Sequence, residues 1–324
     1  MSDPYNPYAK EHENPSGPGD SRPTALQIVK DEGVVNKLSD KVVLITGATS
    51  GVGIEIARAL HETEPRYSLL SEVWRGPRPS IELLQMELDS MDSVRNAAEE
   101  FKKRNDKLNI IVTNAGIIGP ETRTLTKDGF ELAFATNHLG NFLLFQLLKP
   151  LLLASASPEF CSRVVIVSSL RHRMQDVNFD DLDSKTYERM TAYGQSKLAS
   201  IWMANHITRL YGSQNLFATS VHPGLIFTPA AEALPSFYWD MLRNDPKQAG
   251  IIKSAEQGAA TTVWAAIGKQ WEGRGAKYLE DVSVRDVAPN VPDVNIPGPS
   301  KEAYNPVGEE RLWKVSNELL GIKE

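Results

Sequence analysis

Short apolar runs alternate with amphipathic segments along most of the chain. The runs at 41–46, 108–114 and 163–169 are rich in Val and Ile and end at polar or glycine residues, which is typical of buried strands. Segment 52–62 instead carries Ile and Ala at helical spacing. Strands that are buried on both faces and joined by helices form parallel sheets covered on both sides. The sequence therefore predicts an α/β fold with one doubly wound parallel sheet of the Rossmann type.

The connection between the second and third predicted strands is unusually short. We expect these strands at 67–74 and 81–88, and the residues between them include Pro77 and Pro79, which cannot lie inside a helix. A parallel connection normally needs a dozen or more residues, usually including a helix. We therefore expect a shortened second βαβ unit.

The remaining pattern divides the chain into an arm and one domain. Residues 1–38 are polar and rich in Pro and Gly, which predicts a flexible or surface-wrapping arm, and residues 39–324 form a single catalytic domain. Within that domain, 131–153 reads as one long helix with a possible kink near Pro150, and 277–280 as a last edge strand. Residues 229–250 form a substrate loop and 281–324 a C-terminal extension.

Composition excludes several classes of function. The chain of 324 residues has a net charge of −6 and one cysteine, so it lacks the basic surface of a nucleic-acid-binding protein and cannot form an internal disulfide. The histidines fit no zinc-ligand spacing, and we expect no metal. There is no apolar run long enough to span a membrane and no signal peptide at the start. We therefore expect a cytoplasmic protein.

A glycine-rich turn follows the first predicted strand. Gly47, Gly51 and Gly53 lie between that strand and an amphipathic helix, with a spacing that differs from GxGxxG. Such glycines let the backbone approach a phosphate, whose charge then meets the helix N-terminus. The turn therefore indicates dinucleotide binding, although a glycine-rich turn without a ligand would look similar.

A tyrosine and a lysine four positions apart begin the helix predicted at 192–212. Tyr193 and Lys197 share one helix face, where an ammonium group would lower the pKa of the phenol and make it a usable acid or base. Alone, the pair could equally lie on a solvated face. Ligands in such folds bind beyond the carboxyl ends of the strands, where Asn114, Ser168 and Ser169 also lie.

Taken in order, these motifs make the chain resemble the short-chain dehydrogenase/reductase superfamily, nearest to its retinol-dehydrogenase-like and fungal carbonyl-reductase members. The motifs are TGxxxGxG at 46–53, Asp89 after the third strand, NAG at 114–116, NHLG at 137–140, VSS at 167–169, YxxxK at 193–197 and HPG at 222–224. The long segment between Ser169 and Tyr193 resembles the extended loop of the retinol-dehydrogenase-like branch.

The resemblance implies roles for individual residues. It implies that Tyr193 exchanges a proton with the substrate, that Lys197 lowers the pKa of Tyr193 and holds the nicotinamide ribose, and that Ser169 orients the carbonyl, with Ser168 as the alternative. Asn137 would anchor a proton-relay water to the lysine. The implied cofactor-binding residues are Gly47, Ser50, Gly51, Val52, Gly53, Arg75, Asp89, Asn114, Ala115, Gly116, Tyr193, Lys197, Pro223, Gly224 and Thr228.

The residue at the end of the second predicted strand determines the preference between NAD and NADP in such folds. Arg75, with Arg78 nearby, suits the 2′-phosphate of NADP, whereas an acid such as Glu72 would bind the ribose hydroxyl of NAD. We expect NADP(H) over NAD(H), unless these arginines are only solvated loop charges.

The resulting hypothesis is an NAD(P)-dependent oxidoreductase of secondary metabolism that interconverts a ketone or aldehyde and an alcohol. A bulky apolar substrate fits the side chains of the substrate loop, although a helix packed on the sheet would explain them too. The helix at 187–212, with Trp202, Met203 and His206, resembles a dimer helix and suggests a possible homodimer. The alternative is an inactive or cofactor-poor scaffold that acts as an interaction protein.

Overall fold

The computed structural model describes residues 3–70, 81–228, 234, 236–289, 293 and 295–323. Its centre is an eight-stranded sheet with the strand order β3-β2-β1-β4-β5-β6-β7-β8. All neighbouring strands pair in parallel except β7 and β8, which are antiparallel. The strands are β1 Val42–Thr46, β2 Arg66–Leu70, β3 Ile81–Leu84, β4 Ile110–Thr113, β5 Ser162–Val167, β6 Leu216–His222, β7 Tyr278–Glu280 and β8 Ser283–Val284.

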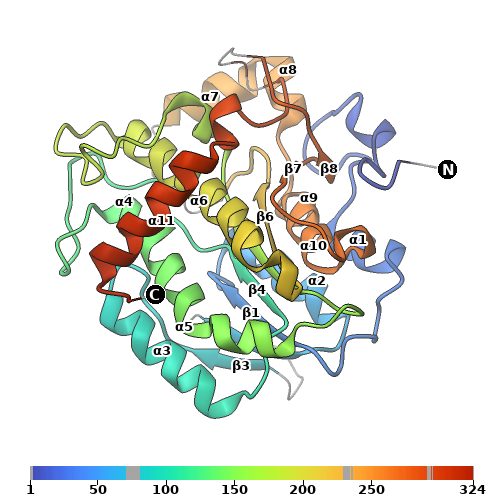
Figure 1. The fold of residues 1–324 in the computed structure, drawn as a ribbon. Coiled ribbons are helices and arrows are strands. Elements are labelled where there is room, and N and C mark those ends of the chain that lie inside the picture. The colour runs from blue at the N-terminus through green and yellow to red at the C-terminus, as the bar shows by residue number, and fades with distance from the viewer. Residues whose placement is uncertain are drawn as a thin grey trace.

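Helices cover both faces of the sheet (Figure 1). Val42 and Leu44 of β1 pack into one core, whereas Val43 and Ile45 pack into the other, because successive strand side chains point to opposite faces. The first core includes α3 Met91–Arg104, α5 Gly140–Ser155, α6 Arg189–Tyr211 and α11 Pro306–Leu320. The second includes α1 Ala25–Asp31, α2 Gly51–His61 and α10 Ala260–Ile267, beside the short α9 Ala255–Gly258. The predicted doubly wound α/β fold is confirmed.

Two strand predictions concern the two edges of the sheet. Tyr67 of β2 pairs with Ile81 of β3, but residues 71–80, which join the strands and include Arg75, lie outside the described residues. The prediction of a shortened second βαβ unit falls on this segment, so it stays a prediction. The segment 277–280 was expected to be the last edge strand, and this is wrong, because β8 adds antiparallel to β7.

The helix predicted at 131–153 is interrupted well before Pro150. It consists of α4 Leu132–Phe134, a π-helical turn at Ala135–Leu139, and α5, which contains Pro150. The Asn141 Nδ2 atom donates to the backbone oxygens of Thr136 and Asn137, both at 3.2 Å. Side chains that insert into the helical hydrogen-bond ladder widen it locally. The π-helical turn therefore surrounds Asn137 rather than Pro150.

The N-terminal arm is folded onto the domain. Its helix α1 buries Ala25, Ile28 and Val29 in the second core. The guanidinium of Arg22, which is 4% exposed, donates to the backbone oxygens of Gly17, Gly250, Ile251 and Ile252, and its Nε atom lies 2.8 Å from Asp20. Arg22 thus ties the arm to the end of α8 Pro246–Ile251, which follows α7 Ser236–Asn244 in the region of the predicted substrate loop.

Arg22→Met should lower the free energy of unfolding by about 3–5 kcal/mol, because it removes the cation that faces Asp20 and the donors of the backbone oxygens of residues 250–252. Urea denaturation measures this. Arg58→Met is the matched control, since Arg58 pairs with Glu55 on the surface and should change stability by less than about 1 kcal/mol. Equal losses in the two variants would contradict the assigned anchoring role.

The C-terminal helix α11 lies across α5 and α6 (Figure 1). Trp202, Met203 and His206 of α6 are buried, and the rings of His206 and Trp313 of α11 lie 5.1 Å apart. These α6 side chains therefore pack within their own chain. The homodimer stays a prediction, and a dimer would have to use a different surface. Across the described ranges, the structure contains no helix with both the length and the apolar character to cross a bilayer.

Candidate active site

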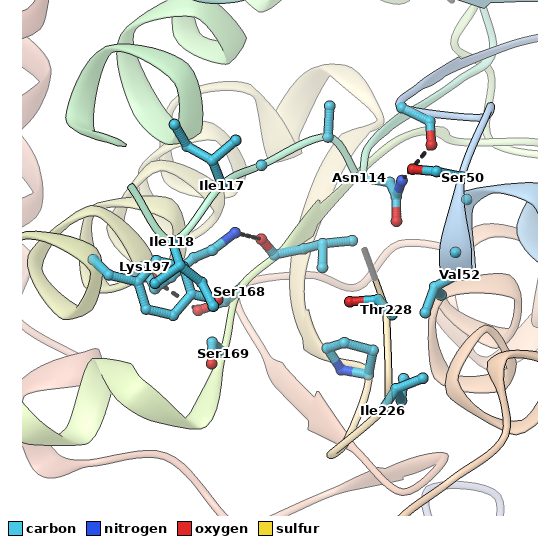
Figure 2. A pocket seen from close by; sticks show the side chains of 18 of the residues that line it. Ser50, Val52, Asn114, Ile117, Ile118, Ser168, Ser169, Lys197, Ile226 and Thr228 are labelled. Carbon is cyan, nitrogen blue, oxygen red and sulfur yellow. Dashed lines mark hydrogen bonds between the residues drawn. The ribbon is translucent and has the colours of Figure 1, made fainter. Parts of the chain in front are cut away.

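A cavity of about 480 Å³ opens at the carboxyl ends of the central strands (Figure 2). Residues at the ends of β1, β5 and β6, and residues of the loops that follow β1, β4, β5 and β6, line it. This is the position that the parallel topology assigns to a ligand. Nearly all the residues that the sequence nominated for cofactor binding line this cavity, namely Gly47, Ser50, Gly51, Val52, Gly53, Asn114, Ala115, Gly116, Tyr193, Lys197, Pro223, Gly224 and Thr228.

The glycine-rich turn forms one end of the cavity and packs too tightly for side chains. Gly47 has a φ of 66°, which favours glycine, and a Cβ added to Gly53 would lie 2.0 Å from the backbone oxygen of Gly47. Ser50 is the N-cap of α2 but makes no side-chain capping bond. The first N–H groups of a helix have no partner within it, so they suit an anion.

Asn114 holds this turn to the end of β4. Its Nδ2 atom donates to the backbone oxygens of Thr46 and Gly47, both at 3.1 Å, and the Ala115 N–H donates to the Thr46 hydroxyl at 3.0 Å. Figure 2 shows Asn114 beside Ser50 and Val52. The two strand ends are therefore fixed relative to each other.

Asn137 lies behind the cavity wall. It is 3% exposed, accepts from Ile117 N–H at 2.8 Å, and donates to Ile117 O at 2.9 Å and to the Ser196 hydroxyl at 2.8 Å. A Cβ on Gly116 would lie 2.8 Å from the Asn137 Oδ1 atom and 3.1 Å from the Lys197 Nζ atom. Asn137 therefore braces the loop after β4 against α6 and comes close to Lys197, without lining the cavity itself.

The two serines at the end of β5 point in different directions. The buried Ser168 hydroxyl donates to the backbone oxygen of Lys197 at 2.8 Å. Ser169 is partly exposed, begins the 3₁₀ turn Leu170–Met174, and forms a hydrogen bond with Tyr193. The arrangement favours Ser169 over Ser168 as the serine that reaches a ligand beside Tyr193.

Lys197 and Tyr193 lie on one face of α6 at the centre of the cavity. The Lys197 Nζ atom donates to the Val167 oxygen at 2.9 Å and lies 5.7 Å from the centroid of the Tyr193 ring. Burial lowers the pKa of Lys197 to about 8.

Burial also raises the pKa of Tyr193, while the Ser169 hydrogen bond and the Arg171 charge act to lower it. The pKa of Tyr193 is therefore shifted upward, whereas the positive charge of Lys197 alone would shift it downward, because the effect of desolvation is larger than that of the nearby charges. In this state Tyr193 is a protonated phenol, and therefore a donor.

The loop after β6 completes the cavity. Gly224 has a φ of 105°, and a Cβ there would lie 2.8 Å from the Lys253 side chain. Thr228 and Ile226 face the cavity in Figure 2. Asp89, the other nominated residue at a strand end, lies in the turn before α3 and does not line the cavity, whereas its neighbour Leu88 does.

A family profile described as short chain dehydrogenase matches residues 41–238, which hold both the glycine-rich turn and the Tyr193–Lys197 pair. The chain belongs to the short-chain dehydrogenase family. Its relatives place it in the retinol-dehydrogenase-like branch, and this short-chain dehydrogenase is therefore an oxidoreductase of alcohols and carbonyl compounds.

Similarity to relatives of this family extends over nearly the whole chain. The chain is 41% identical to "Short-chain dehydrogenase/reductase prx1" of Penicillium roqueforti, over 99% of this chain and 96% of that protein. It is 33% identical to mouse retinol dehydrogenase 12, over 89% of this chain and 88% of that protein. A solved structure of a putative uncharacterized protein from Mycobacterium paratuberculosis superposes with a TM-score of 0.67 at 25% identity, over 90% of this chain and 97% of that one.

Sequence reasoning missed several residues that line the cavity of this short-chain dehydrogenase. Ile117 and Ile118 follow Gly116 directly, so their place at the end of β4 could have nominated them. Arg171 comes two positions after Ser169, and Met190 comes three before Tyr193. No local pattern marks Met86, which lines the cavity because β3 ends beside β2.

Proposed function

We propose that this short-chain dehydrogenase is an NADP(H)-dependent enzyme that interconverts a ketone or aldehyde and an alcohol on a bulky apolar substrate. The observation that carries the proposal is one cavity with two chemically different ends. The glycine-rich turn at Gly47–Gly53 forms one end, and Ser169, Tyr193 and Lys197 meet at the other.

The residues at the glycine-rich end fit a dinucleotide. The space that a side chain at Gly47 would fill is occupied by Ala115, and the space at Gly53 is occupied by the Gly47 carbonyl and Asn114. Without side chains of its own at these positions, the turn presents the N–H groups at the start of α2 to the cavity. Lys197 and Thr228 would hold the nicotinamide end. When bound, the nicotinamide supplies the hydride for reduction or accepts it in oxidation.

The chain's own residues handle the substrate oxygen and its proton. In the reducing direction Tyr193 donates its phenolic proton to the carbonyl oxygen, and Ser169 donates a hydrogen bond to the same oxygen. Donors already in place where negative charge develops stabilise the transition state. Asn137 fixes Ile117 and Ser196 and so keeps the wall and α6 in position.

The preference for NADP(H) rests on sequence. Arg75 and Arg78 follow β2, where a positive charge suits a 2′-phosphate. Both arginines lie outside the described residues, so the preference stays a prediction.

The apolar part of the cavity supports a bulky apolar substrate. The apolar residues that line it include Leu170, Met190, Ile226, Leu234 and Trp239. A role in secondary metabolism, a cytoplasmic location and a homodimer are further parts of the proposal.

Oxidation of NADPH and of NADH, followed by absorbance against a panel of bulky ketones, tests the function. We expect turnover with at least one hydrophobic ketone and a kcat/KM at least tenfold higher with NADPH. Turnover with NADH alone would contradict the cofactor preference. Absence of binding and of turnover with both cofactors would instead support the scaffold alternative.

A further inference from the structure

Arg171 is a cation at the substrate end of the cavity that the proposed reaction does not use. It lies in the 3₁₀ turn Leu170–Met174, directly after Ser169, and it lines the cavity. The backbone N–H of Arg171 donates to the Ser169 hydroxyl at 3.3 Å. A Cβ on Gly194 would lie 2.9 Å from the Arg171 carbonyl oxygen, so its backbone packs directly on α6 beside Tyr193.

The side chain of Arg171 has no hydrogen-bond or ion-pair partner among the residues that the structure describes. Its Nε atom is sealed from solvent and unsatisfied. Glu188 is close enough for the Arg171 charge to lower its pKa, but its two carboxylate oxygens accept from Met190 and Thr191 N–H groups at 3.0 and 2.6 Å. Arg173 in the same turn, by contrast, donates to the backbone oxygens of Asp293 and Ile296.

The buried edge of this guanidinium lacks a partner. Arg171 as a whole is partly exposed, but a buried N–H group without a hydrogen bond is unfavourable, and its chain neighbour Leu170, which also lines the cavity, offers no acceptor on its side chain. No Asp or Glu appears among the described residues that line the cavity. A ligand can supply the missing anion, and a planar guanidinium binds a carboxylate through two parallel hydrogen bonds.

We propose that Arg171 binds a carboxylate of the substrate, so that the enzyme acts on an oxo acid or hydroxy acid with a bulky apolar body. The inference rests on the proposed function, because it assigns the substrate class of the same cavity. Since Arg171 adjoins both Ser169 and Tyr193, the carboxylate lies on the same side of the substrate as the reacting oxygen. The apolar body then packs against Leu170, Met190 and Trp239.

Calorimetric titration of two matched probes tests this assignment. The probes are 2-naphthoate and its methyl ester, which have the same ring and differ in charge, each titrated into protein with and without saturating NADPH. We expect the wild-type protein to bind the acid at least tenfold more tightly than the ester. In Arg171→Gln this preference should disappear through weaker binding of the acid, and Arg171→Lys should restore part of it.

Arg173→Gln is the control, because Arg173 comes from the same turn but holds backbone carbonyls rather than lining the cavity. It should keep the preference for the acid. Equal affinity for acid and ester in the wild type, no binding of the acid, or an unchanged preference in Arg171→Gln would overturn the inference. Titrating NADPH itself into the wild-type protein reports cofactor binding, so a failure of the proposed function appears separately as the absence of that signal.

Discussion

Tyr193→Phe should lower kcat by about a thousandfold, within the range that a positioned general acid contributes. The change removes the one hydroxyl that gives its proton to the substrate oxygen, while the ring keeps its place on α6 beside Lys197. Losing the hydrogen bond between the buried Tyr193 phenol and Ser169 should have only a small effect on the free energy of unfolding. Absorbance assays of NADPH oxidation measure the loss, and a fluorescence titration measures cofactor affinity.

The control is Ser168→Ala, which removes the neighbouring hydroxyl that only donates to the Lys197 backbone oxygen. It should keep kcat within about tenfold of the wild type, because a typical net hydrogen bond is worth about 1 kcal/mol. If Tyr193→Phe keeps near-normal turnover, the chemistry assigned to the pair is wrong.

Gly53→Ala should destabilise the protein and weaken cofactor binding by more than tenfold. On helix propensity alone, alanine inside α2 would stabilise by about 1 kcal/mol. The structure predicts the opposite sign, because the new methyl group would lie 2.0 Å from Gly47 O and 2.6 Å from the Asn114 amide nitrogen. The turn must open, which costs about 1–3 kcal/mol in a packed region.

Urea denaturation gives the sign of the stability change, and NADPH titration gives the loss of affinity, which we expect to exceed tenfold. Gly33→Ala separates backbone strain from this collision, since Gly33 has a φ of 64° and an added Cβ there would meet nothing within 4 Å. That control should lose about 1–2 kcal/mol and keep cofactor affinity. A Gly53→Ala protein that is more stable than the wild type would contradict the assigned packing.

The sheet could be predicted from the sequence because its central strands are apolar on both faces. Val42–Thr46 and Ile110–Thr113 are buried along their whole length, and such strands leave a continuous apolar run. The first core-forming helix of the chain could not be predicted in the same way. The helix α1 is only seven residues long, and its apolar face is defined by contact with α10, far away in sequence.

The candidate site, like the fold, could be predicted only in part from the sequence. Its residue types follow from motifs at strand ends, but their directions depend on partners distant in sequence. The Ser168 hydroxyl points away from the ligand side because it donates to the Lys197 carbonyl, and the Asn137 amide points to the loop after β4 and to α6 because Ile117 and Ser196 bind it. The direction of the Tyr193 pKa depends on how deeply the fold buries it, which i, i+4 spacing does not reveal.

The central claim is that the cavity between the glycine-rich turn and Tyr193 holds a nicotinamide dinucleotide. The most direct test is the melting temperature of the wild-type protein as NADPH is added. A ligand that binds only the folded state stabilises it by about 2.7 kcal/mol at a hundred times its Kd, so the claim predicts a Tm that rises with the logarithm of the cofactor concentration above Kd and rises more for NADPH than for NADH. An unchanged Tm at millimolar concentrations of both cofactors would contradict it.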